Sequence, residues 1–372
     1  MMRIITQFSR IFVGVLFIFS GLIKANDPLG FSYKLDEYFE VFGTEFLMPL
    51  SLFLAIFMCV LEVVLGFFLL LGARIKLTLW LLLALTVFFG FLTFYSAYYD
   101  VVKSCGCFGD AIKLTPWQSF WKDMILLAFV LILLIGQKHI NSLLGETAEN
   151  IAMAIIIAGT VAFPVYTYNY LPIKDFRAYA IGKNIPEQTL GKPDVLKFFY
   201  TLKNKKTAET KEFDTWPENW DVEWDYVSSR NEVVEKGVEP QIKDFGISSV
   251  EDGADYTQDI ITNPNYNFLL IAYDLAKTEK DVQGRINDFY ELCSNDSVSF
   301  VCLTASGKDL VTPFKAEYKI NYPFYNTDGT VLKTMIRANP GLMLLKGGVV
   351  IDMWHYNSFP AYNDVKQKYF GK

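Results

Sequence analysis

The sequence predicts an α-helical membrane bundle followed by an α/β domain outside the membrane. Three observations support this fold class. Of the 372 residues, 52% are apolar and only 20% are charged, and the mean hydropathy of +0.24 is high for a soluble protein of this size. Residues 1–171 carry only 21 of the 74 charged side chains, although they form almost half of the chain. Strand-like and turn-like runs begin only after residue 171.

Five apolar stretches are long enough to cross a bilayer, which takes about 20 residues of helix. Lys24 directly follows the first stretch and no small-x-small cleavage site is present, so we expect a retained anchor rather than a cleaved signal peptide. The stretches are 10–23, 47–71, 77–98, 120–135 and 151–170.

These features predict four successive regions. A four-helix membrane domain is expected over 1–145 and a fifth transmembrane helix over 146–172. A β-rich connecting segment is expected over 173–237, and the α/β domain over 238–372.

The distribution of basic residues predicts the orientation, because cytoplasmic loops carry an excess of Lys and Arg. We expect the N-terminus to be cytoplasmic, since Arg3, Arg10, Arg74, Lys76 and Lys138 all fall on one side of the spans. The loops 24–46 and 99–119 then face outward. With five spans, everything after residue 171 faces outward too, which in a bacterium is the periplasmic side of the inner membrane.

Composition argues against two kinds of partner. The net charge is -6 and no basic run is present, so nucleic-acid binding is not expected. His139 and His355 are the two histidines and lie far apart in sequence, so we expect no histidine-ligated haem or metal centre.

Two thiols one residue apart, Cys105 and Cys107, occupy the outward loop after the third span. Glycine at 106 permits the tight backbone that a bridge across one residue needs, and such a strained, exposed bridge suits thiol exchange better than bracing. A static loop is the main alternative. A metal site is a third, although two thiolates alone would leave a zinc site half empty.

An intramembrane carboxylate, Glu62, lies in the second span. A carboxylate at that depth is expected to face the bundle interior and to mark a paired or functional position. Lys24, at the end of the first span, is its candidate cationic partner; a protonated Glu62 bonded to a neighbouring helix is the alternative. Cys59 lies on the same helical face and is interpreted as an apolar filler, too deep to pair with Cys105 or Cys107.

The segment Phe19-Ser20-Gly21-Leu22-Ile23-Lys24, the carboxylate Glu62 and the segment Ser104-Cys105-Gly106-Cys107-Phe108-Gly109 resemble the DoxX and MauE group of bacterial four-helix inner-membrane proteins, of Bacteroidota type. The resemblance covers residues 5–140. MauE-like proteins are associated with disulfide formation or maturation of periplasmic methylamine dehydrogenase, and their architecture is similar to quinone-linked thiol oxidases of the vitamin K epoxide reductase type.

The resemblance implies redox roles for Cys105 and Cys107, and functional roles for Glu62 and Lys24. A lipid quinone is the electron acceptor it implies. The chain departs from the epoxide reductase pattern because it has no Cys-x-x-Cys near a quinone pocket, so a complete electron relay is not expected. Nothing in the sequence indicates methylamine as a substrate.

The connecting segment predicts a small sheet. Strands are expected over 195–202, 207–213 and 220–228, with a hairpin turn at 203–206. We interpret Trp216, Trp220 and Trp224 as packing residues rather than as ligand-stacking residues.

The last region predicts alternating strands and helices. A strand is expected to open at 240–245, with buried strands over 267–273 and 298–304, helices over 281–293 and 308–318, and a closing hairpin over 342–345 and 349–354. This order resembles the TlpA-like branch of the thioredoxin fold. Asn339 and Pro340 stand where that family places a cis-proline beside its active site.

The usual thiols of that family are missing. Asp274-Leu275-Ala276-Lys277 stands where the Cys-x-x-Cys belongs, so the usual exchange by this domain is excluded. Cys293 and Cys302 are interpreted as buried fillers, and His355 as a surface or hydrogen-bonded histidine. A degenerate domain of this fold can still hold an extended chain beside its proline by pairing along a strand edge.

Two functional hypotheses follow. In the first, the bundle offers Cys105 and Cys107 for periplasmic thiol-disulfide chemistry or maturation of exported proteins, while the outer domain recruits a periplasmic or membrane protein partner. In the second, the chain is a non-catalytic membrane-anchored scaffold or assembly subunit with a binding face. Transport is the least favoured class, because the bundle has few ionisable or Gly/Pro-broken segments.

Overall fold

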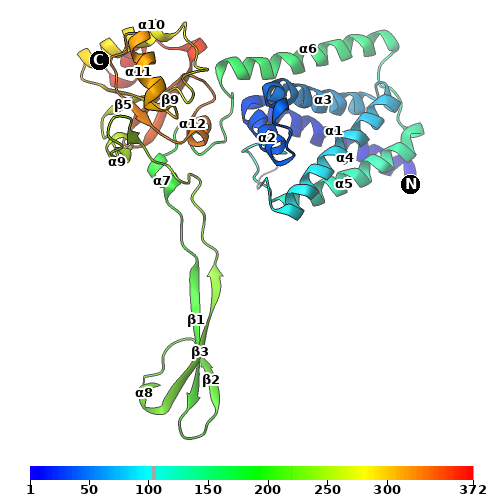
Figure 1. Ribbon diagram of the computed structural model, residues 1–372. Coiled ribbons are helices and arrows are strands. Elements are labelled where there is room, and N and C mark those ends of the chain that lie inside the picture. The colour runs from blue at the N-terminus through cyan, green and yellow to red at the C-terminus, as the bar shows by residue number, and fades with distance from the viewer. Residues whose placement is uncertain (103–105, 219, 372) are drawn as a thin grey trace.

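The computed structural model describes residues 1–102, 106–218 and 220–371. Figure 1 shows three parts: a helical bundle that carries the N-terminus, an α/β domain at one end of the bundle, and a long arm of strands that projects from the α/β domain. We call the end of the bundle next to the α/β domain its domain end.

Five helices of the described chain are long and apolar enough to cross a membrane, as the sequence predicts. The first four of them surround a core in which Val13, Leu69, Leu79, Val130 and Leu133 are fully buried. α6 lies along the outside of the bundle, where Thr167 donates a hydrogen bond of 2.7 Å to the carbonyl oxygen of Ala25. The helices are α1 (Met2–Asn26), α3 (Ser51–Leu71), α4 (Ile75–Tyr99), α5 (Pro116–Gly136) and α6 (Glu146–Tyr170).

The first helix begins at Met2 rather than at residue 10, and Arg10 explains the difference. Its guanidinium is buried inside the bundle and donates hydrogen bonds to the carbonyl oxygens of Leu69 at 2.9 Å and Leu70 at 2.7 Å. These carbonyls belong to the last turn of α3, where helical partners are missing. Arg10 therefore caps a neighbouring helix instead of marking the start of its own.

The loop expected over 24–46 contains a helix that the sequence analysis missed. α2 (Pro28–Val41) begins where Asp27 accepts a hydrogen bond from the Gly30 amide at 2.8 Å and Pro28 takes the first helical position. A 3₁₀ helix, η1 (Glu45–Leu50), then leads into α3. The Asp-Pro pair was the available signal for this helix.

The arm is a three-stranded antiparallel sheet in the order β2-β1-β3, reached through α7 (Ile185–Thr189). The strands are β1 (Val195–Asn204), β2 (Thr210–Phe213) and β3 (Trp224–Glu235). The strand expected over 220–228 was placed too early, because α8 (Trp220–Glu223) occupies its first residues. The ring centroid of Trp216 lies 4.5 Å from that of Tyr200 and 4.6 Å from that of Trp220. These contacts are consistent with the packing role expected for the tryptophans.

The α/β domain holds a six-stranded sheet in the order β4-β7-β6-β5-β8-β9. β5 and β6 are parallel, as are β6 and β7, whereas β8 and β9 are antiparallel to their neighbours. The strand expected at 240–245 is wrong: those residues form no strand, and the edge strand follows them. The strands are β4 (Ser248–Ser249), β5 (Tyr266–Ile271), β6 (Ser299–Thr304), β7 (Phe324–Asn326), β8 (Gly341–Lys346) and β9 (Val349–His355).

Helices cover both faces of this sheet. Alternate residues of β5 point to opposite faces, so Phe268 and Leu270 pack with α10, α11 and α13, while Leu269 and Ile271 pack with α9 and α12. Cys293 and Cys302 lie in the first of these cores, fully buried, as expected. The helices are α9 (Thr257–Ile261), α10 (Gln283–Asn295), α11 (Lys308–Glu317), α12 (Gly329–Met335) and α13 (Tyr362–Val365). Short turns of helix include η2 (Gln137–His139), η3 (Tyr356–Ser358) and η4 (Lys366–Phe370).

Candidate functional site

Cys107 lies in the loop that joins α4 to α5 at the domain end of the bundle. Its thiol is free and half-buried. Cys105 lies outside the described residues. Gly106, between the two cysteines, has a φ of +67°, a conformation that side chains with a Cβ rarely adopt, and an added Cβ would lie 3.3 Å from Cγ of Lys34. Glycine at this position is therefore required by the backbone.

Lys24 and Glu62, which the sequence paired, form a buried ion pair. Their side chains are 3% and 2% exposed, and Lys24 Nζ contacts Glu62 Oε1. The ammonium also lies 5.2 Å from the ring centroid of Phe31 and 4.9 Å from that of Phe89. α1 and α3 pack closely where Gly21 faces Val63, and this close packing brings Lys24 and Glu62 together. A side chain at position 21 would prevent it, because its Cβ would lie only 2.6 Å from Cγ2 of Val63.

Ser20 connects this ion pair to the cysteine loop. Its hydroxyl lies 3.1 Å from Glu62 Oε2 and 3.0 Å from the carbonyl oxygen of Cys107. The hydroxyl has one proton and can donate to only one of these oxygens at a time. The backbone carbonyl of Cys107 and the buried carboxylate of Glu62 thus share the Ser20 hydroxyl as a neighbour.

A second ion pair, which the sequence analysis missed, lies at the start of α5. Lys122 Nζ is 2.6 Å from Asp123 Oδ1, and Thr93 Oγ1 donates to Asp123 Oδ2 at 3.1 Å. The Asp123 side chain is 3% exposed and that of Lys122 is 21% exposed. Lys122 Nζ also lies 5.5 Å from the ring centroid of Phe108, the neighbour of Cys107. The available signal was an adjacent lysine and aspartate inside an apolar span.

Both ion pairs line one small internal cavity together with Cys107. The cavity has a volume of about 30 Å³, which is room for about two water molecules. Burial raises the pKa of the Cys107 thiol above its ordinary value, and the charge of Lys122 opposes that rise. Among the described residues, the cavity's other ionisable groups are Lys24, Glu62, Lys122 and Asp123.

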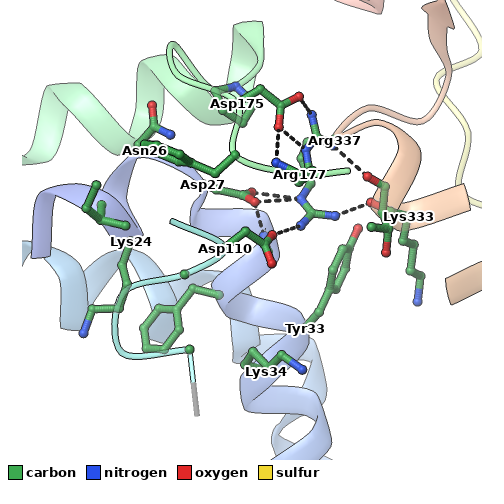
Figure 2. A pocket seen from close by; sticks show the side chains of 18 of the residues that line it. Lys24, Asn26, Asp27, Tyr33, Lys34, Asp110, Asp175, Arg177, Lys333 and Arg337 are labelled. Carbon is green, nitrogen blue, oxygen red and sulfur yellow. Dashed lines mark hydrogen bonds and ion pairs between the residues drawn. The ribbon is translucent and has the colours of Figure 1, made fainter. Parts of the chain in front are cut away.

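The α/β domain is fastened to the bundle beside this loop. Figure 2 shows Arg337 reaching Asp27, whose two carboxylate oxygens each accept from Nε at 2.9 Å, with Asp110 of the cysteine loop 3.8 Å from Nη2. The hydroxyls of Tyr33 and Tyr273 lie 3.4 Å apart across the same junction. Burial would raise the pKa of Asp27, but the charges of Arg337 and Arg177 and the Gly30 hydrogen bond hold it below its ordinary value.

A pocket of about 380 Å³ lies at this junction, lined by residues of the bundle and of the α/β domain. Gly106 and Gly109 of the cysteine loop line the pocket, whereas Cys107 lines the internal cavity. The cysteine loop therefore lines both the junction pocket and the internal cavity.

Asn339 and Pro340 are joined by a cis peptide bond, at the position expected for it. The side-chain amide of Asn339 donates to the carbonyl oxygen of Asp274 at 2.8 Å. This contact places the proline loop beside 274–277. Arg337 and Tyr273, which flank these two segments, both contact the bundle.

A quinone does not fit the described surroundings of Cys107. The internal cavity is too small for a quinone ring. A groove of about 420 Å³ on α1 lies near the cysteine loop. The ring centroid of Phe19, which lines the groove, is 5.8 Å from that of Phe108 in the loop. Its lining residues carry no side-chain donor for a quinone carbonyl: Phe8, Ile11, Phe12, Val15, Leu16 and Phe19.

Comparison with known families gives one result for this region. The family described as Methylamine utilisation protein MauE matches residues 2–136, a little over a third of the chain. The matched range contains the first four membrane-capable helices, Lys24, Glu62, both cysteines of the loop, Lys122 and Asp123. No curated protein and no solved structure matches the chain. The N-terminal region is thus similar to a MauE-type membrane protein.

Proposed function

We propose that this chain is an integral membrane protein of the MauE type that exchanges disulfides with exported proteins through Cys105 and Cys107. In this proposal the N-terminus is cytoplasmic, and the cysteine loop and the α/β domain lie on the periplasmic side, where disulfides persist. The proposal covers periplasmic redox chemistry or maturation of exported proteins.

The observation that carries the proposal is the setting of Cys107. Buried ion pairs are expensive, and in membrane helices they mark functional positions more often than they add stability. Here two of them, Lys24 with Glu62 and Lys122 with Asp123, line the same cavity as the thiol. A static surface loop has no need of such surroundings.

The proposed exchange needs no reactants other than thiols and disulfides. With the pair oxidised, a partner thiolate attacks one of its sulfurs, a mixed disulfide forms, and the other sulfur leaves as a thiolate. The second thiol of the partner then loses its proton and attacks the mixed disulfide. The partner leaves with a disulfide, and Cys105 and Cys107 hold the two electrons. A disulfide carried by another protein regenerates the pair by the same steps in reverse.

We propose that the α/β domain is a degenerate TlpA-like thioredoxin domain that recruits the partner. Its sheet order and the cis peptide bond before Pro340 support this assignment. Sulfur chemistry is left to the bundle, because 274–277 contains no cysteine and Cys293 and Cys302 are buried. Arg337 would hold the domain over the cysteine loop.

A non-catalytic scaffold is the second candidate function. It is favoured by the same junction, since an ion pair between Arg337 and Asp27 and a contact between Tyr33 and Tyr273 suit a rigid platform. In that case the protein would function without Cys105 and Cys107, and the docked α/β domain alone would bind the partner.

Covalent trapping separates the two. Replacing Cys107 or Cys105 by serine leaves one thiol of the pair, which should accumulate as a mixed disulfide with a specific exported protein. The adduct should disappear on reduction and be missing from the double variant. Cys293→Ser is the matched control and should trap nothing. Unaltered function of both single variants without any adduct would favour the scaffold.

A further inference from the structure

The internal cavity beneath Cys107 contains two lysines, and they are not equivalent. Lys24 is 3% exposed, contacts Glu62 and lies between the rings of Phe31 and Phe89. Lys122 is 21% exposed and is oriented by Asp123, whose Oδ1 takes one of its three N–H donors. Lys122 also lies over Phe108, so it is the lysine that contacts the cysteine loop.

The charges around the cavity cancel while Cys107 is a thiol. Two ammonium groups face two carboxylates, and each carboxylate is already engaged: Glu62 by Lys24 and Ser20, and Asp123 by Lys122 and Thr93. Thiol exchange requires a thiolate, which adds one negative charge to a space with little water. That charge needs a cation beside it to form near neutral pH.

We propose that Lys122 is the positioning residue that stabilises the thiolate of Cys107, and that Asp123, held by Thr93, orients the lysine and limits its effect. This proposal rests on the function proposed above. In the part of the chain that the structure describes, the charged groups that face the thiol are Lys24 of α1, Glu62 of α3, and Lys122 and Asp123 of α5. Lys34 of α2 lies on the other side of the loop, against Gly106.

The two members of the α5 pair then have opposite effects on one titration. Removing Lys122 takes away the stabilising charge, so the thiolate should form at higher pH. Removing the charge of Asp123 leaves the lysine free to interact with sulfur, so the thiolate should form at lower pH. If the pair were only structural, removing either member would shift the pH at which the Cys107 thiolate forms in the same direction, or would not shift it.

The test is the pH dependence of alkylation of Cys107 in the full-length protein. It uses purified Cys105→Ser protein that has been reduced to release any trapped partner and then freed of the reductant, with iodoacetamide as the probe and mass spectrometry of the Cys107 peptide as the readout. Lys122→Met should raise the midpoint by about one pH unit, which is about a tenfold slower reaction below the midpoint. Lys122→Arg should preserve it, and Asp123→Asn should lower it.

Lys113→Met is the matched control, because Lys113 is an exposed lysine of the same loop; it should leave the midpoint unchanged. An unchanged midpoint in folded Lys122→Met would overturn the proposal. If that variant does not accumulate, Asp123→Asn decides, since an unchanged or raised midpoint contradicts the assigned roles. The titration involves no partner, so its outcome is independent of the trapping experiment that tests exchange.

Discussion

The domain end of the bundle and the α/β domain differ in what they bury. At the domain end, two ion pairs with side chains between 2% and 21% exposed surround the half-buried Cys107. In the α/β domain, Cys293 and Cys302 are fully buried in an apolar core, and burial raises the pKa of both thiols. On the function that we propose, neighbouring charge rather than the presence of sulfur distinguishes the reactive thiol from the thiols that only pack.

The largest effect should come from breaking the deepest ion pair of the bundle. Glu62→Leu leaves the Lys24 ammonium buried without a carboxylate, which should cost about 3–5 kcal/mol of unfolding free energy. Thermal unfolding in detergent measures the loss. The double variant Lys24→Met with Glu62→Leu should recover most of it, because it removes both charges. A single variant as stable as wild type would mean that the pair is not formed.

The next effect concerns the junction between the two regions. Arg337→Ala removes charged hydrogen bonds to Asp27 and should weaken docking by about 2 kcal/mol. Hydrogen exchange in the first turn of α2 and in α12 should then accelerate, while exchange in β5 should not. Lys333→Ala is the control: its ammonium lies 5.0 Å from the ring centroid of Tyr33, a contact worth about 0.5–1 kcal/mol. Equal effects of both variants would contradict the assigned role of Arg337.

One pH effect should arise in the α/β domain, at His355. Burial lowers the pKa of His355 to about 4 from the ordinary 6.5, and its Nδ1 accepts a hydrogen bond of 3.1 Å from the Asn357 amide. The unfolded chain therefore binds the proton first as the pH falls. The contribution of His355 to stability should be constant above pH 6.5 and should decline between 6.5 and 4, by up to about 1.4 kcal/mol per pH unit. His355→Gln should flatten this decline in pH-dependent unfolding, and an unchanged slope would contradict it.

The smallest effect is expected from an exposed ion pair in the segment that precedes β4. Lys243 Nζ lies 2.6 Å from Glu239 Oε2, with side chains 61% and 83% exposed. Lys243→Ala should change the unfolding free energy by less than about 0.5 kcal/mol. If Lys243→Ala lowered the unfolding free energy as much as Glu62→Leu does, burial would not determine how much an ion pair contributes to stability.

The sequence predicted the parts of the fold that depend on local pattern. Spans, the buried strands and the helices between them follow from hydrophobic periodicity, and these elements lie where expected to within a few residues, apart from the earlier start of α1. Elements set by a single cap or by tertiary contact were missed, such as α2 after Asp27 and the short strands β4 and β7. Of the site, Lys24 and Glu62 were visible as rare charges in lipid. Lys122 and Asp123 were visible in the same way, as charges inside an apolar span, but their place beside Cys107 depends on which helices meet. Arg337 was not visible, because its role depends on the contact between the two domains.

The most direct test of the account is the redox state of the cysteine loop in cells. Acid quenching, alkylation of the free thiols with a maleimide and mass spectrometry of the resulting peptides report each thiol of the chain separately. The account predicts that Cys105 and Cys107 shift together between dithiol and disulfide when cells are treated with a reductant or an oxidant, while Cys59, Cys293 and Cys302 stay reduced. A pair that remains fully reduced under the oxidant would contradict the central claim.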